Sequence, residues 1–303
     1  MVMADVAPSE YTDSRHKRLP IELLLRCGVP YESCFVLERS HESVHRSDKI
    51  SMPDTVRIAA IGDLHIRTTI PSDYVRQLIG IEERADVLIV PGDITNGGRI
   101  QEVELAAELF RRIDIPIVGV MGNHDRRTMR RRYFLKILEQ AGVRMLDGET
   151  WEYMGIGVAG VSGSGGGFWP EEAADPVSNR AWQALSVRAR REAARLDDAL
   201  DRLETQRRIA LLHFAPTIST LIGEPPLKYW LLGNSTLGHV VEKHHVDLVL
   251  HGHAHIGSPY GMTPGGVPVF NVAAGVTGGV SIHEIPLDPS LPISTSPLMM
   301  ASV

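Results

Sequence analysis

The amino-acid sequence predicts a layered α/β fold in which many strands pair in parallel. Five short apolar runs, rich in Val and Ile, each end in a cluster of polar residues. Runs of this length and composition are typical of buried strands. Helical stretches lie between them, and such alternation is typical of a layered fold with parallel pairing. The five runs are VRIAAIGDLH (56–65), ADVLIVPGD (85–93), IPIVGVMGNHD (115–125), RRIALLHF (207–214) and VDLVLHGHAH (246–255).

Helices are expected after each of the first three runs. They cover residues 72–83, 101–112 and 130–140. The longest helical stretch is 170–206, which is charged and rich in Ala and Arg. It carries Leu196, Leu200 and Leu203 at helical spacing, so this stripe is expected to face the core.

A second group of strands is expected in the middle and near the end of the chain, and it would form a further sheet or extend the first. These strands cover residues 151–162, 267–274 and 280–285. The domain organisation that follows has three parts. We expect an N-terminal arm at 1–53, a main domain at 54–287 and a Pro- and Ser-rich tail at 288–303.

Composition excludes several classes of protein. The chain has 303 residues, of which 43% are hydrophobic, so one large core can be buried. Its net charge of −6 argues against a general nucleic-acid binder. No apolar run approaches the ~20 residues of a membrane span, and no signal segment stands out, so a cytoplasmic protein without a membrane partner is expected. Cys27 and Cys34 are expected to be free thiols, since two cysteines imply no disulfide framework.

Metal-ligand side chains follow all five apolar runs. In α/β sheets, sites form in the loops beyond the carboxyl ends of the strands. A single Asp or His after a strand means little, but five consecutive occurrences indicate a site. The residues are Asp63 and His65, Asp93, Asn123 and His124, His213, and His253 and His255.

These residue types indicate a metal centre with two ions. Imidazole, carboxylate and amide groups suit Mn, Fe and Zn, and the absence of thiolates argues against a structural Cys-type zinc site. The set is too large for one catalytic metal, whereas two metals that share one carboxylate use it fully. In both Asp63-x-His65 and His253-x-His255, side chains two apart point to the same side of an extended chain.

The motifs together resemble the calcineurin-like metallophosphoesterase superfamily. GDLH, GDITNGG, GNHD, a lone His213 after a strand, and GHAH occur in the order of that family's pattern, across residues 61–255. Each motif alone is weak, but the ordered set is highly specific. Within the superfamily, the chain looks closest to bacterial phosphoesterases related to cyclic-nucleotide phosphodiesterases.

The resemblance implies a fold and a ligand scheme. The implied fold is a four-layer α-β-β-α sandwich, with two face-to-face mixed β-sheets flanked by helices. Asp63, His65 and His255 would bind one metal. Asn123, His213 and His253 would bind the other, and Asp93 would bridge the two. His124 would assist the leaving group, and Asp125 would orient His124 and raise its pKa.

The expected activity is hydrolysis of a small phosphoester by a metal-activated hydroxide, with Mn, Fe or Zn as the metals. A phosphodiester of a small nucleotide or related metabolite is the first hypothesis. A phosphomonoesterase acting on a metabolite or phosphoprotein is the alternative, followed by a catalytically inactive scaffold. The net negative charge of the chain argues against a nuclease. A homodimer is left open.

A few further residues carry weaker signals. Arg67, Arg126 and Arg127 lie just beyond ligand motifs, where they would either contact a phosphate or serve as surface charges. His239, His244 and His245 are expected to lie near the surface of a helical stretch and to be solvated.

Overall fold

The computed structural model describes residues 54–168, 180–288, 290 and 291. The predicted arm 1–53, with both cysteines, lies outside the described residues, as do residues 169–179 and most of the predicted tail. Among the described helices, none combines the length and the apolar character needed to cross a membrane.

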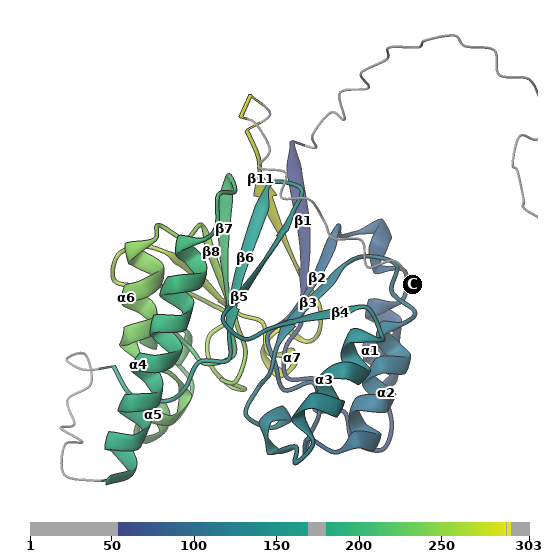
Figure 1. Ribbon diagram of the computed structural model, residues 1–303, viewed down its shortest axis with the longest axis horizontal. Helices are drawn as coiled ribbons and strands as arrows, with labels where there is room; N and C mark the ends of the chain where they lie inside the picture. The colour runs from purple at the N-terminus through teal and green to yellow at the C-terminus, as the bar shows by residue number, and fades with distance from the viewer. Residues whose placement is uncertain (1–53, 169–179, 289, 292–303) are drawn as a thin grey trace, which may run out of the picture. The chain divides into compact units, whose positions relative to one another are not determined.

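Two β-sheets form the centre of the described domain (Figure 1). The first sheet has the order β11-β1-β2-β3-β4, in which β1 to β4 are parallel and β11 is antiparallel to β1. Its strands are β1 (Thr55–Ala60), β2 (Val87–Val90), β3 (Ile117–Val120), β4 (Val143–Leu146) and β11 (Ser281–Pro286).

The second sheet has the order β5-β6-β7-β8-β10-β9. Strands β6, β7, β8 and β10 are parallel, whereas β5 and β9 are antiparallel edge strands. Its strands are β5 (Glu149–Tyr153), β6 (Ile156–Val161), β7 (Arg207–Leu212), β8 (Leu248–His251), β9 (Tyr260–Met262) and β10 (Pro268–Asn271).

Helices cover the outer face of each sheet, so the domain has four layers (Figure 1). The helices α1 (Ser72–Leu78), α2 (Ile100–Phe110) and α3 (Arg131–Glu139) lie on the first sheet, and α4 (Arg180–Asp201) and α6 (Ser235–Lys243) lie on the second. Two helices of one turn, α5 (Tyr229–Leu232) and α7 (Ala274–Thr277), lie in loops. The predicted four-layer sandwich is therefore confirmed.

Alternation along the strands builds three apolar interfaces. In β1, Val56 and Ile58 face the second sheet, while Ala59 faces the helices. In β7, Ile209 packs between the sheets, whereas Ala210 packs beneath α4 and α6. Successive side chains of a strand point to opposite faces, so fully apolar strands are needed where both faces are buried. The predicted Leu stripe of α4 is buried in the same way.

Several predicted elements differ from the structure. The helix predicted at 72–83 ends at Leu78, because Gly80 takes a left-handed φ of 81° and a 3-10 turn follows at Ile81–Glu83. The strand predicted at 151–162 is a hairpin of β5 and β6. Its turn has positive φ at both Met154 and Gly155, the geometry of a tight two-residue connection. Strands β4 and β9 were not predicted.

Candidate metal centre

The predicted ligands lie at the carboxyl ends of β1, β2 and β3 in the first sheet and of β7 and β8 in the second. Backbone hydrogen bonds join the loops of the two sheets. The Gly62 N–H after β1 donates to the Val272 carbonyl after β10 at 2.8 Å. Five strand ends from two sheets therefore meet at one edge of the domain.

All seven predicted ligands come together there. The donor atoms form two groups, and within each group they lie within 4.8 Å of one another. The first group is Asp63, His65, Asp93 and His255, and the second is Asp93, His213 and His253. Asn123 joins the second group, because its Oδ1 lies 2.9 Å from His213 Nε2. Asp93 belongs to both groups, the position predicted for a bridging carboxylate.

The two aspartates have different surroundings. Asp63 Oδ1 lies 2.9 Å from His255 Nε2, and its Oδ2 accepts a hydrogen bond from the His253 N–H at 2.9 Å. Asp93 Oδ1 accepts from the His124 N–H at 2.8 Å. Asp93 Oδ2 is buried and has no hydrogen-bond partner. A buried carboxylate oxygen without a partner is costly, so Asp93 Oδ2 is suited to a cation.

The backbone is strained at four of the seven positions. Six non-glycine residues among those described have positive φ, and four of them are Asp63 (57°), His65 (43°), Asp93 (48°) and His253 (71°). Such conformations cost about 1–3 kcal/mol each and persist where the surrounding structure fixes them. The strain therefore coincides with the candidate site.

Glycine is required directly before Asn123 and His253. A Cβ on Gly122 would overlap the Asp93 carboxylate, and a Cβ on Gly252 would overlap the Asp63 carboxylate. Each glycine thus lets the loop that carries one candidate ligand pack closely against the carboxylate of a candidate ligand in another loop.

Burial and mutual contacts set the charges in the site. Burial alone would raise the pKa of Asp63, but the hydrogen bond with His255 and the nearby His213 outweigh it and hold this pKa below its ordinary value. The same hydrogen bond raises the pKa of His255. Burial lowers the pKa of His65, and it lowers the pKa of His253 to about 3. His65 and His253 are thus neutral at pH 7, the form that can bind a metal.

His124 is oriented by a backbone carbonyl. Its Nδ1 lies 2.5 Å from the carbonyl oxygen of Asn96, in the loop after β2. A carbonyl only accepts hydrogen bonds, so Nδ1 carries the hydrogen and Nε2 remains for another contact. The sequence offered no signal for Asn96, because a backbone carbonyl is independent of residue type.

The Asp125 carboxylate makes no hydrogen bond to the His124 imidazole, so its predicted orienting role is wrong. Its carboxylate is fully buried and accepts hydrogen bonds from Ile94 N, Thr95 N, Thr95 Oγ1 and Gly122 N at 2.7–3.1 Å. Burial and the charge of Asp93 raise the pKa of Asp125 to about 6. Asp125 therefore holds the loops after β2 and β3 together.

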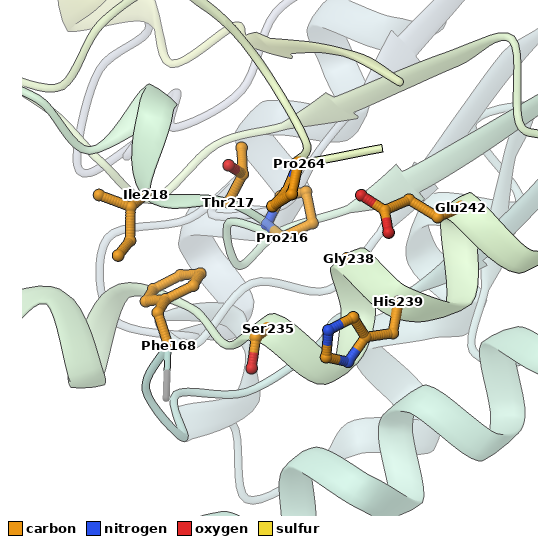
Figure 2. Close-up of a pocket in the computed structure, with 9 residues that line it drawn as sticks. All are labelled: Phe168, Pro216, Thr217, Ile218, Ser235, Gly238, His239, Glu242 and Pro264. Atoms are coloured by element: carbon orange, nitrogen blue, oxygen red, sulfur yellow. The ribbon is translucent and has the colours of Figure 1, made fainter. Parts of the chain in front are cut away.

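A separate cavity of about 340 Å³ lies near the carboxyl end of β7 (Figure 2). Phe168, Pro216 and Ile218 form apolar walls, and His239 and Glu242 of α6 line another side. The residues that line it include none of the seven predicted ligands. The candidate metal centre is therefore distinct from this cavity.

Comparison with known proteins agrees with this geometry. The family model for calcineurin-like phosphoesterase matches residues 56–257. The glycerophosphodiester phosphodiesterase GpdQ of Enterobacter lignolyticus (strain SCF1) is 35% identical over 71 residues, which are 23% of this chain and 26% of that protein. The match thus spans about a quarter of the length of this curated relative.

Two solved structures share the fold. Phosphopantetheinyl hydrolase (PptH) from Mycobacterium tuberculosis has a TM-score of 0.54 at 19% identity, with 75% of this chain and 90% of that chain covered. A putative 5'-nucleotidase from Staphylococcus aureus has a TM-score of 0.51 at 12% identity, with 77% of this chain and 51% of that chain covered.

Proposed function

This chain belongs to the calcineurin-like phosphoesterase family, and from that premise we propose that it hydrolyses phosphodiesters of a small nucleotide or related metabolite with two bound metal ions. One observation carries the proposal. Asp93 lies in both donor groups and keeps a buried carboxylate oxygen without a hydrogen-bond partner. A structural carboxylate would instead be satisfied by donors, as Asp125 is.

The donor set fits two ions of Mn, Fe or Zn, because it combines imidazoles with carboxylate and amide oxygens. Asp63, His65 and His255 would hold one ion together with Asp93. Asn123, His213 and His253 would hold the other, also with Asp93. The neutral state of His65 and His253 favours this role.

Bound metal ions would supply Lewis-acid polarisation of the phosphoryl oxygens and lower the pKa of the attacking water from 15.7 toward ~7. The chain's own residues then position the leaving group. The Asn96 carbonyl holds the Nδ1 hydrogen of His124, so in the doubly protonated imidazolium Nε2 is the nitrogen that passes its proton to the departing oxygen. General acid catalysis of this kind contributes roughly 10²–10⁴-fold.

The diester preference is supported by the local match to GpdQ, a glycerophosphodiester phosphodiesterase. We expect the manganese-loaded protein to hydrolyse bis-p-nitrophenyl phosphate faster than p-nitrophenyl phosphate, measured as kcat/KM from p-nitrophenol release. Asp93→Ala should abolish both activities, whereas Asp114→Ala, at an exposed aspartate, serves as the matched control. A large preference for the monoester would favour the phosphomonoesterase instead. Metal binding without hydrolysis of either ester would favour an inactive scaffold.

A further inference from the structure

Arg127 contacts the ring nitrogen of His124 that faces the leaving group in the proposed reaction. Its Nη2 lies 3.2 Å from His124 Nε2, and the side chain is otherwise exposed. In the neutral imidazole, the Nδ1 hydrogen of His124 is given to Asn96, so Nε2 is the acceptor and Arg127 is the donor. A guanidinium has five N–H donors in a planar fork, so most of its donors remain for another acceptor.

The charge of Arg127 is not balanced by a neighbouring carboxylate. Its neighbours Arg126 and Arg131 are both paired with Asp147, at 3.3 and 2.6 Å. Across residues 54–168 and 180–288, no carboxylate lies within 4.0 Å of the Arg127 guanidinium. Within this arginine-rich stretch, the cation nearest His124 therefore remains available to an anionic ligand.

The backbone of Arg127 is held in place, although its side chain is exposed. Arg127 ends the 3-10 turn Asp125–Arg127, which begins at the buried Asp125. Gly98, with a φ of 69°, lies directly against this turn, where a Cβ would meet Thr128 N at 2.6 Å. The turn thus fixes the distance of the Arg127 backbone from His124, and only the side chain is left to adjust.

We propose that Arg127 is a specificity-determining residue that binds an anionic group carried by the part of the substrate that leaves. The inference rests on the proposed function, in which His124 Nε2 lies beside the departing oxygen. A carboxylate or second phosphate just beyond that oxygen would meet the guanidinium fork, which matches such groups in a bidentate way. The substrates are thus diesters whose leaving group is itself an anion.

Two esters that are matched in size but differ in the charge of the leaving group test this proposal. Methyl 3-carboxyphenyl phosphate has an anionic leaving group, and methyl 3-carbamoylphenyl phosphate has a neutral one of nearly the same size. The manganese-loaded full-length protein should prefer the carboxylate ester by roughly tenfold in kcat/KM, the equivalent of one charge-assisted hydrogen bond. Arg127→Gln should remove most of this preference. Arg132→Gln, at an exposed arginine of α3, is the matched control and should keep it.

Equal losses on both esters in Arg127→Gln would overturn the proposal, and so would an equal loss of preference in Arg132→Gln or a wild-type protein without preference. Equilibrium dialysis of the two esters against chelator-treated protein repeats the comparison without turnover. If the wild type hydrolyses neither ester but still binds the carboxylate ester more tightly through Arg127, the proposed hydrolysis fails and the anion site stands. If the wild type hydrolyses the esters but neither hydrolysis nor binding of the carboxylate ester depends on Arg127, the anion site fails and the proposed hydrolysis stands.

Discussion

At the residue scale, Asp125 shows how one buried carboxylate organises the loops of the site. Its two oxygens accept four hydrogen bonds from the loops after β2 and β3, which also carry Asp93 and Asn123. A buried polar group is stable only when it is satisfied in this way. Asp125 therefore positions the loops that carry these candidate ligands by hydrogen-bonding to them, and it has no direct part in the proposed reaction.

Replacement of Asp125 by Asn tests this role. The amide NH₂ would face N–H donors in place of an acceptor, so we expect the free energy of unfolding to fall by about 1–3 kcal/mol per unsatisfied donor. Urea denaturation of the metal-free protein measures the change, and Asp114→Asn provides an exposed control. Unchanged stability together with slower turnover would mean that Asp125 acts on His124 after all.

Sequence reasoning identified the seven candidate ligands that the structure brings together, but it missed the groups that support them. The seven predicted ligands are side chains whose chemistry is visible in the residue type, and their position after apolar runs indicated where they would meet. Asn96 contributes a carbonyl, which any residue has. The predicted pairing of Asp125 with His124 failed because the two side chains have different partners. The Asp125 carboxylate accepts from N–H and O–H groups of the neighbouring loops, whereas His124 Nδ1 faces the Asn96 carbonyl.

At the element scale, α4 and α6 are joined across the outer face of the second sheet. Asp197 of α4 accepts hydrogen bonds from Lys243 at 2.6 and 2.8 Å, and its Oδ1 lies 2.5 Å from His244 Nε2. His244 is 6% exposed, so its predicted solvation is wrong. His244 is the C-cap residue of α6, and its imidazole contacts Asp197 of the neighbouring helix α4.

The contact predicts a pH-dependent stability. Hydrogen bonds from Lys243 and then His244 lower the pKa of Asp197. A carboxylate with a lowered folded-state pKa adds stability above its unfolded-state pKa of about 3.9, and this is lost as the pH falls through the folded-state value. We expect Asp197→Asn to lower the free energy of unfolding by about 0.5–1 kcal/mol at pH 7.

Chemical denaturation at several pH values should show wild type and Asp197→Asn converging in acid. The exposed neighbour Asp198 offers the control substitution Asp198→Asn. A difference in the free energy of unfolding between wild type and Asp197→Asn that stays constant down to pH 3 would contradict the charge-based explanation.

Element boundaries were predictable where the sequence pattern was strong. The apolar runs gave β1, β2, β3, β7 and β8, but the pattern did not say that three belong to one sheet and two to the other. That division depends on which faces of the strands pack together. The four-layer arrangement was predicted only from the family resemblance. Strand β9 has only three residues and β4 carries an exposed Arg144, so neither has a clear apolar period.

At the scale of the whole molecule, the candidate metal centre connects two sheets. The loops after β1, β2 and β3 supply Asp63, His65, Asp93 and Asn123, and the loops after β7 and β8 supply His213, His253 and His255. A ligand that binds only the folded state stabilises it by mass action. Bound metals would therefore stabilise the contact between the two halves of the sandwich.

Metal removal tests this connection. We expect EDTA to lower the Tm of the manganese-loaded wild type, measured by scanning calorimetry. Asp93→Ala should lose this EDTA effect, because in the proposed site Asp93 would serve both ions. His124→Ala should keep the EDTA effect and its metal content while turnover falls by roughly 10²–10⁴-fold. Equal loss of metal in His124→Ala would make His124 a ligand, and near-normal turnover in Asp93→Ala would overturn the bridging role.

The pairing of β1 with β11 bears on how the protein is made. β11 completes the first sheet beside β1, with Thr55 opposite Pro286, and the Gly62 N–H beside Asp63 is bonded to Val272. A ribosome delivers β1 and Asp63 long before it delivers Val272 and β11, because most of the domain lies between them in the sequence. Until β11 emerges, the nascent chain exposes the edge of its first sheet beside β1, and the loop that carries Asp63 gains its backbone partner Val272 only after the strands of the second sheet have been synthesised.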